Sequence, residues 1–328
     1  MAQRRQDVPS ESLRSTAGRE MASSAASVLE AESAPRPTAV SSPLKDGLRR
    51  FRRNWAAMIS GITIIALIVM AIFAPFLHSA DPLAQNYDAL GIGPTWQHWF
   101  GTNGLGQDQY SRVLYGLRVP LIVGIVGTVI TVILGAFFGV IAGYFGGVID
   151  QLLARFTDVI FAFPGFTLAL IVVSLYGDAL NFLGGSGRVV ILTIVFAIVG
   201  WPGLMRFVRS LALTMKEQQF VEAARTSGSS SWKIMTQHLL PNMYGVILVQ
   251  ASFLVVFFVT TEAVLSILGL GVTPPNPDIG QMLFDGVQNM GTNYWQMIFP
   301  TMFLTIIILA FTFFGDGVRD AVDPRGQP

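Results

Sequence analysis

Cysteine is absent from this 328-residue chain, and charged residues make up only 12% of it. Without cysteine the chain can form neither a disulfide bond nor a thiolate metal site. It also contains no Gly-x-x-x-x-Gly-Lys-Ser/Thr phosphate loop, no Ser/His/Asp arrangement, no metal-binding helix motif and no glycine-rich dinucleotide turn. We therefore expect no catalytic residue, no bound metal and no ATP site within the chain itself.

Charge of either sign is scarce and nearly balanced. The chain has 21 Lys and Arg residues, 20 Asp and Glu residues and only three histidines, which gives a formal net charge of +1. This balance gives no reason to expect a nucleic-acid partner. We interpret His78 and His98 as ordinary surface histidines rather than metal ligands. His238 falls on the other face of the predicted membrane topology, so the three cannot form one site.

Long apolar runs are abundant instead. Hydrophobic residues make up 52% of the chain and the mean hydropathy is +0.55, which is typical of a polytopic membrane protein. Six runs are each near the ~20 residues that a bilayer demands. The sequence therefore predicts an all-α integral membrane protein with six transmembrane helices, at about 55–77, 120–144, 152–176, 189–210, 244–268 and 296–315.

The polar segments between these runs set the domain boundaries. Residues 1–44 are rich in Ser, Ala, Pro, Arg and Glu without apolar periodicity, which predicts a disordered tail and no signal peptide. Residues 45–118 are expected to hold the first crossing and an extracytoplasmic loop, and residues 119–316 the core transmembrane domain. Residues 317–328 are expected to form a short C-terminal tail.

Basic residues near the helix ends predict the orientation. If the N-terminus is cytoplasmic, thirteen Lys and Arg residues between Lys45 and Arg325 lie on the inner side, and only Arg112, Arg118 and Arg188 lie on the outer side. We therefore expect both termini and the segment 216–242 to be cytoplasmic.

The segment 216–242, KEQQFVEAARTSGSSSWKIMTQHLLPN, is the one long polar stretch between runs of spanning length. It predicts a helix over Glu217–Ser227 that ends at Gly228, and then a second helix over Trp232–Leu240 that is capped by a serine and stopped by Pro241. Ala224 and Gly228 are expected to share a face with almost no side chain, where another protein could approach closely. From the residues alone, an amphipathic hairpin on the lipid headgroups is an equal alternative.

The spacing within this segment resembles a known family. Its residues are similar to the EAA loop of the permease subunits of bacterial ABC importers, and most closely to the oligopeptide and dipeptide (peptide/nickel) group of the second-subunit type. The resemblance implies a type I ABC importer permease fold in which the loop is a coupling helix docked on a cytoplasmic ATPase. The matching residues expected to carry the coupling are Glu222, Ala223, Ala224, Arg225, Gly228, His238, Pro241 and Asn242.

The family pattern extends over most of residues 45–325. The loop that follows His98 resembles the family's, although Asn103 stands where Asp is usual and Gln107 where Arg is usual. The end of the second crossing matches as well. There Gly135, Gly139 and Gly143 form a small-residue stripe that allows a neighbouring helix to pack closely.

Two proline motifs are candidate hinges. Pro164 is expected to kink the third crossing, where Arg155 can pair with Asp158 three residues later. Pro202 and Gly203 are expected to interrupt the fourth crossing just before the segment 216–242. A broken helix directly before a docking element is a plausible hinge, although membrane helices also contain proline kinks that do not move.

Glu262 is the one acid well inside an apolar run. A carboxylate there costs about 2.5–3.5 kcal/mol even on the lenient insertion scale, so it should face protein or a water-filled cavity. A structural partner inside the bundle and a role as a pathway or gate residue both stay open.

The resemblance implies a function and a set of partners. The chain would be a multi-pass permease subunit of the bacterial inner membrane, pairing in the lipid bilayer with a second homologous permease. Two ATP-binding subunits or domains would hold ATP and Mg, and an extracytoplasmic substrate-binding protein would deliver peptides. The alternatives are the same architecture importing nickel or another small solute, and a self-contained channel or secondary carrier.

Overall fold

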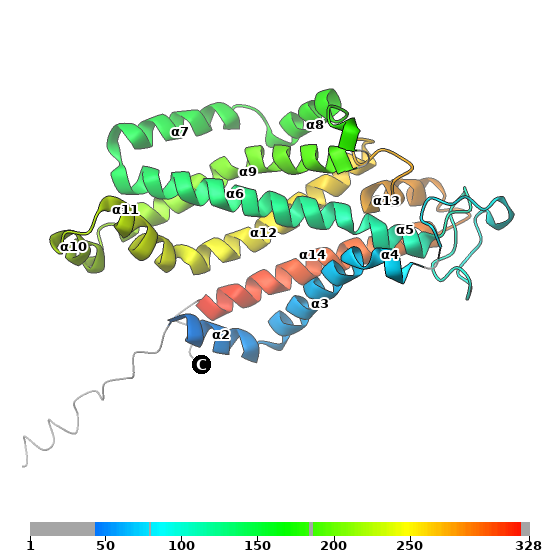
Figure 1. Ribbon diagram of the computed structural model, residues 1–328, viewed down its shortest axis with the longest axis horizontal. Helices are drawn as coiled ribbons and strands as arrows, with labels where there is room; N and C mark the ends of the chain where they lie inside the picture. Colours follow the sequence, from blue (N-terminus) through cyan, green and yellow to red (C-terminus); the bar gives the residue numbers. More distant parts are fainter. Residues whose placement is uncertain (1–42, 79, 184–185, 323–328) are drawn as a thin grey trace, which may run out of the picture. The chain divides into compact units, whose positions relative to one another are not determined.

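The computed structural model describes residues 43–78, 80–183 and 186–322 and is helical through most of that length (Figure 1). The predicted N-terminal tail falls almost entirely on residues 1–42, which lie outside the described residues. One compact unit begins at Gly47 and contains every long apolar helix of the described part.

The elements follow one another in a simple order. They are α2 (Pro43–Arg53), α3 (Trp55–Ile72), α4 (Ala74–Leu77), η1 (Tyr87–Ala89), α5 (Gln109–Gly116), α6 (Arg118–Phe145), α7 (Gly147–Phe161), α8 (Gly165–Tyr176), η2 (Asn181–Leu183), α9 (Ser186–Met215), α10 (Gln219–Thr226), α11 (Ser231–Ile234), η3 (Met235–Leu239), α12 (Leu240–Ile267), α13 (Ile279–Gln288) and α14 (Trp295–Val322).

Five of the apolar stretches in the described residues are long and apolar enough to cross a membrane, or six if the bent pair α7 and α8 is one span, which is compatible with the six runs of the sequence. Within the described residues, five continuous helical stretches are long and apolar enough: 55–72, 109–145, 186–215, 231–267 and 295–322. The sixth is the pair α7 and α8, whose axes differ by 69° at a short break. The predicted third crossing is thus bent at a break, with the geometry of a broken span or of a re-entrant loop.

Helices α6 and α9 run in the same direction, and the predicted glycine stripe is their contact. A Cβ atom added to Gly135 would lie 2.8 Å from Leu204, and one on Gly139 would lie 2.7 Å from Val208. One added to Gly143 would lie 2.6 Å from the Cβ of Ala212. Because any side chain here would overlap α9, the stripe sets how closely the two backbones approach.

The segment 216–242 lies at the same end of the unit as the last turn of α14 and the first turn of α3, and we call this the loop end. Asn54, which caps α3, donates to Asp320 near the end of α14 at 3.2 Å. The start of α12 lies there too, since a Cβ on Gly245 would meet Val322. Helix α14 continues to Val322, so residues 317–322 of the predicted C-terminal tail are helical.

The two proline motifs behave differently. Pro164 stands at the break between α7 and α8 as the N-cap residue just before α8, so the helix is broken there rather than merely kinked. The expectation that Pro202 interrupts the next crossing is wrong, because α9 is continuous from Ser186 to Met215. Trp201 and Pro202 are both buried against neighbouring helices, and such packing lets membrane helices tolerate proline.

The long loop before α5 is held at the end opposite the loop end. Phe100 stacks on Phe299 of α14 with ring centroids 4.0 Å apart. His98 is not an ordinary surface histidine, because its Nδ1 lies 2.9 Å from Oδ1 of the buried Asp108. Asn103 and Gln107 are buried and bonded to each other, with Asn103 Nδ2 donating to Gln107 Oε1 at 2.8 Å. The two positions that depart from the family pattern therefore brace the loop internally.

Candidate functional site

Two short helices and a tight turn project from the loop end as the candidate site. Helix α10 ends in a Schellman cap, in which Ser229 N–H donates to the carbonyl of Ala224 at 3.0 Å and Gly228 N–H to that of Arg225 at 2.9 Å. Gly228 has a φ of +77°, a left-handed conformation that glycine adopts at little cost. Ser230 then caps α11 by accepting from Lys233 N–H. The predicted turn and cap are confirmed.

Helix α10 is anchored by one apolar face. Val221 and Ala224, three residues apart, are buried together with Ile234, Leu239 and Val208. The expectation that Ala224 and Gly228 share an outward face is therefore wrong. Ala224 is only 8% exposed and belongs to the core, because it and Val221 are the residues that fix α10 to the bundle.

The outward face of α10 carries Glu222 and Ala223, which are both exposed. No residue in the described part of the chain forms an ion pair with Glu222. Arg225 is three positions away, but its guanidinium lies 5.3 Å from the centre of the Tyr144 ring, at the end of α6. The carboxylate of Glu222 is thus open to solvent, while Arg225 ties α10 to α6 through a cation–π contact.

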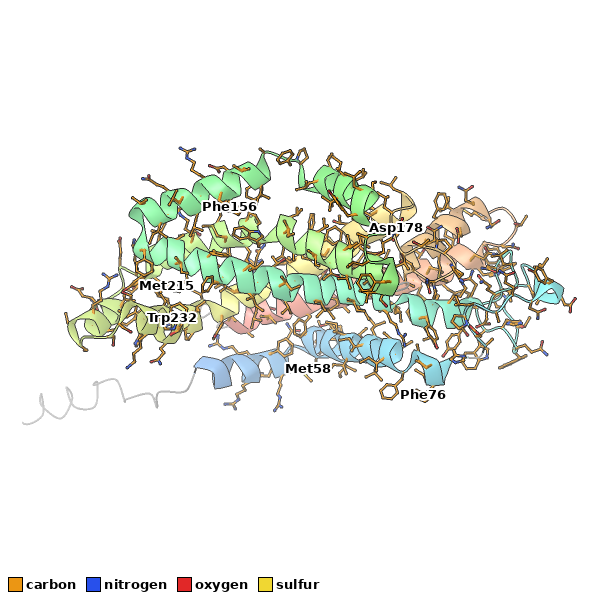
Figure 2. All side chains as sticks on the ribbon, turned by 45° about the horizontal axis from the view of Figure 1, so that its top comes forward. Met58, Phe76, Phe156, Asp178, Met215 and Trp232 are labelled. Atoms are coloured by element: carbon orange, nitrogen blue, oxygen red, sulfur yellow. The ribbon has the colours of Figure 1, made fainter. Side chains whose placement is uncertain are left out.

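Two large apolar side chains are also exposed at this end. Phe220 is 40% exposed and Trp232 is 57% exposed, and Trp232 lies on the same side of the bundle as Met215, where α9 ends (Figure 2). Exposed aromatic residues beside an open charge are typical of the anchors of protein interfaces.

The second helix of the segment does not stop at Pro241. Residues 235–239 form one turn of π-helix, and the chain then continues directly into α12, with Pro241 in its first turn. Proline cannot donate to the carbonyl four residues back, and the wider turn accommodates this loss. Asn242 Nδ2 donates to the carbonyl of His238 at 2.6 Å. The candidate loop is therefore joined rigidly to a membrane-spanning helix.

Glu262 is fully buried in α12 and lies far from the loop end. Ser266 Oγ lies 2.9 Å from Glu262 Oε1 and 2.5 Å from Asp278 Oδ2, so the two carboxyl groups meet at one hydroxyl. Asp278 caps α13 by accepting from Gly280 N–H at 3.1 Å, and burial raises its pKa. No pattern in the sequence points to Asp278, because only the fold brings residue 278 back to α12.

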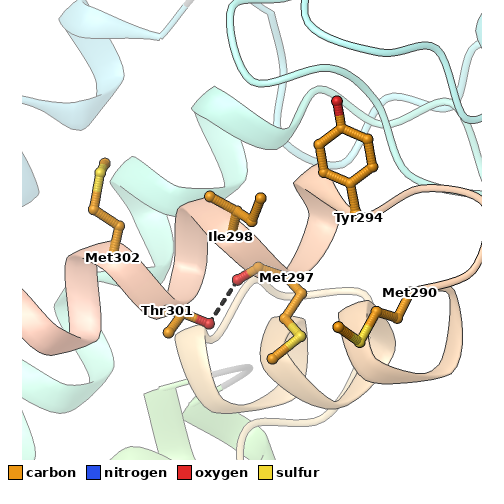
Figure 3. A pocket seen from close by; sticks show the side chains of 6 residues that line it. All are labelled: Met290, Tyr294, Met297, Ile298, Thr301 and Met302. Carbon is orange, nitrogen blue, oxygen red and sulfur yellow. Dashed lines mark hydrogen bonds between the residues drawn. The ribbon is translucent and has the colours of Figure 1, made fainter.

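One hollow of the surface is almost entirely apolar. A pocket of about 380 Å³ at the start of α14 is lined by Met290, Tyr294, Met297, Ile298, Thr301 and Met302 (Figure 3). Its one aliphatic hydroxyl, that of Thr301, already donates to the carbonyl of Met297 at 2.7 Å. Among the described residues, no group of three or more His, Asp or Glu side chains could hold a metal ion. The loop-end segment is therefore the better candidate site.

Two family models match the chain. Residues 135–327 match the binding-protein-dependent transport system inner membrane component, and residues 42–94 match the N-terminal transmembrane domain of oligopeptide transport permease C. The first covers all of the core from the glycine stripe to the end of α14. The second covers α2, α3, α4 and the start of the long loop.

Similar proteins agree with these models. The glutathione transport system permease proteins GsiD of Shigella boydii serotype 4, Shigella sonnei and Escherichia coli O157:H7 are each 39% identical over 301 residues, which is 91% of this chain and 96% of each relative.

Solved structures share the fold. A chain of the inward-facing MetNI methionine ABC transporter has a TM-score of 0.52 at 18% identity, over 65% of this chain and 97% of that chain. A second crystal form of that transporter has a TM-score of 0.50 at 20% identity, over 64% of this chain and 96% of that chain. The chain therefore belongs to the binding-protein-dependent inner membrane permeases and is a C-type permease subunit of an ABC importer of the oligopeptide and dipeptide (peptide/nickel) family.

Proposed function

We propose that this subunit forms half of the translocation pathway for di- or oligopeptides, and that the segment 216–242 couples it to ATP hydrolysis by docking in a groove of an ATPase subunit. The observation that carries the coupling role is the outward face of α10, where Glu222 is an exposed carboxylate without an ion partner in the described chain. Phe220 and Trp232 supply exposed apolar area on the same segment.

The way the segment is held supports the transmission of force. Val221 and Ala224 bury one side of α10, the Schellman cap fixes the turn, and the chain continues through the π-turn into α12 without a break. Inverting a 1:99 population of two conformations requires about 5.5 kcal/mol of differential binding. A docked element can deliver such energy to the bundle only if it does not bend, and this segment is braced at both ends.

The proposal includes the remaining partners and the orientation. A second homologous permease would complete the pathway in the bilayer of the inner membrane. Two ATPase subunits would bind ATP and Mg on the cytoplasmic side, and an extracytoplasmic binding protein would deliver the cargo. The loop end, with both chain termini, would be cytoplasmic. The basic residues Arg209, Lys216, Arg225, Lys233 and Arg319 at that end support this assignment.

Peptide cargo is supported by the relatives, which are named for glutathione, a modified tripeptide. We propose the same chemical class for this chain. The purified importer is tested for uptake of glutathione and of di-alanine, with nickel as the competitor. This measurement tests the cargo separately from the coupling role.

The coupling role is tested with single cysteines, because the native chain has none. A cysteine in place of the exposed Ala223 is expected to cross-link to a cysteine in the ATPase groove, whereas one in place of the buried Ala224 is the matched control and should not. Failure of Ala223→Cys at every groove position would overturn the docking. Glu222→Ala is expected to abolish ATP-driven uptake while the assembled complex still forms.

A further inference from the structure

A charged pair joins α7 and α9 at a depth where charges are rare. Arg206 Nη2 lies 2.6 Å from Asp158 Oδ1, and the hydroxyl of the buried Thr157 accepts from Arg206 Nε at 3.3 Å. Arg206 also lies over the ring of Phe161, 4.4 Å from its centre. The sequence predicted a pair between Arg155 and Asp158, but that contact is longer, at 3.7 Å.

The pair lies well inside the span. Along the helix axis, Asp158 lies roughly 16 Å from the first residue of α7, and Arg206 lies roughly 14 Å from the last residue of α9. Helix α6, which packs along α9 at this level, has no charged residue from Val119 to Phe145. Asp158 and Arg206 therefore lie beside a helix that is apolar over this whole stretch.

These side chains are nevertheless open. Arg206 is 44% exposed and Asp158 is 50% exposed even with their mutual contact in place. They belong to a set of exposed residues on α7 and α9 that we call the polar stripe: Gln151, Arg155, Asp158, Gly203, Arg206 and Ser210.

Helix α3 shows what a lipid-facing surface of this chain looks like. All of its exposed residues are apolar: Trp55, Ile59, Ile62, Ile65, Ala66, Val69 and Ile72. A charged side chain in hydrocarbon costs about 2.5–3.5 kcal/mol on the insertion scale, so the polar stripe does not face lipid. It must face water or protein.

The pair also has hydrogen-bonding capacity to spare. Nη1 of Arg206 has no partner among the described residues, and a guanidinium carries five donors. Asp158 Oδ2 has only the long contact to Arg155. One unit of positive and one of negative charge, both reachable from the same side, complement a molecule that has a carboxylate and an ammonium group.

We propose that the polar stripe lines the water-filled passage through which the importer moves its cargo, and that Arg206 and Asp158 bind the carboxylate and ammonium ends of a zwitterionic, peptide-like cargo. This inference rests on the proposed peptide function. It assigns pathway residues that the sequence analysis could not identify.

Accessibility tests the first half. Single cysteines at Gly203 and Ser210, in the complete importer in vesicles, are treated with a charged, membrane-impermeant thiol reagent from the loop end. Cysteines at Ile62 and Ile65 of α3 are the controls at similar depth. We expect the stripe cysteines to react at least about tenfold faster, because the ionic reagent cannot enter hydrocarbon. Equal rates would overturn the passage. The readout needs no uptake, so it is independent of whether segment 216–242 couples.

Protection tests the second half. The importer with cysteine at Gly203 is labelled in the presence of millimolar di-alanine or of its N-acetylated, C-amidated form. Di-alanine is expected to slow the labelling at least about twofold and the capped form is not, and Arg206→Gln or Asp158→Asn should remove the protection. Three outcomes would overturn the cargo contact. They are no protection by di-alanine when only Gly203 is changed, equal protection by the two probes, and protection that the Arg206 and Asp158 variants leave unchanged. A purely structural ion pair would not distinguish the two probes.

Discussion

The Arg209 guanidinium donates to both carboxylate oxygens of Asp150 and so joins α9 to the first turn of α7. Asp150 is 15% exposed and Arg209 is 34% exposed, so water screens this contact only in part. Helix α9 ends at Met215, a short distance beyond Arg209, and leads straight into the segment 216–242. A paired, fork-shaped contact here fixes the direction in which that segment leaves the bundle.

Asp150→Asn and Arg209→Lys are therefore expected to uncouple transport. A hydrogen bond to a charged group contributes about 1.5 kcal/mol, and losing that much corresponds to roughly a tenfold change in rate. We expect ATP-driven uptake to fall by about this factor while ATP hydrolysis by the complex continues. The measurement is the ratio of cargo moved to ATP hydrolysed in proteoliposomes. The exchanged pair Asp150→Arg with Arg209→Asp should recover part of the loss. Single variants that couple uptake to ATP hydrolysis as well as the wild type does would show that the contact is incidental.

The second prediction concerns Gly139 on α6. A Cβ atom there would lie 2.7 Å from both the carbonyl oxygen of Met205 and the Cβ of Val208. Backbone cannot move aside cheaply, and overpacking of this kind costs about 1–3 kcal/mol. Gly139→Ala is expected to lower the thermal midpoint of the purified complex by several degrees.

Gly61 on α3 is the matched control for this variant. A Cβ atom there would meet only Phe314, at 3.8 Å, which is an ordinary contact. Gly61→Ala should leave the midpoint unchanged or raise it slightly, because alanine is the better helix former. If both substitutions had the same effect, the close approach of α6 and α9 would not be the cause.

The features that sequence reasoning recovered are local ones. The glycine repeat, the cap at Gly228 and the six apolar runs each follow from residues a few positions apart. The break at Pro164 follows from proline chemistry alone. Pro202 carries the same chemistry, yet α9 is continuous there, because the outcome depends on neighbouring helices that no local pattern describes.

The features that the sequence did not predict depend on the tertiary arrangement. Ala224 could face outward or inward on α10, and only the position of Val208 and Leu239 decides that it is buried. Asp158 has Arg155 as a local partner three residues away, but the fold supplies Arg206 at a shorter distance. Asp278 meets Glu262 through a loop whose path the sequence does not define.

The third prediction concerns Gly228. With a φ of +77° and no other atom close enough to hinder a Cβ, the conformation of its own backbone is the only obstacle to a side chain. A left-handed residue with a side chain costs about 1–2 kcal/mol, and asparagine is among the few that adopt this conformation routinely. Gly228→Asn should therefore retain most ATP-driven uptake and Gly228→Val should lose most of it. Protease sensitivity of the segment 216–242 should follow the same order, and equal uptake by the two variants would contradict a role for the turn.

The last prediction concerns Asp278 and the dependence of stability on pH. Burial raises the pKa of its carboxyl above the ordinary value, so between those two values the folded protein binds a proton that the unfolded chain has released. The contribution of this carboxyl to stability is therefore greatest at low pH and falls as the pH rises through the raised pKa. The groups facing this carboxyl are Glu262 and Ser266 from α12 and the backbone N–H groups of Val272 and Gly280.

Asp278→Asn keeps the shape and the acceptor of the cap but has no charge to bury. Its thermal midpoint should differ least from that of the wild type near pH 4, close to the ordinary pKa of aspartate, and exceed it increasingly as the pH rises. Asp285→Asn on the same helix is the control, since Asp285 is less buried and accepts from Gln281 at 3.1 Å. Midpoints of the purified complex measured from pH 4 to 9 decide the matter. A constant difference between Asp278→Asn and wild type would mean that burial does not raise the pKa of the carboxyl at position 278.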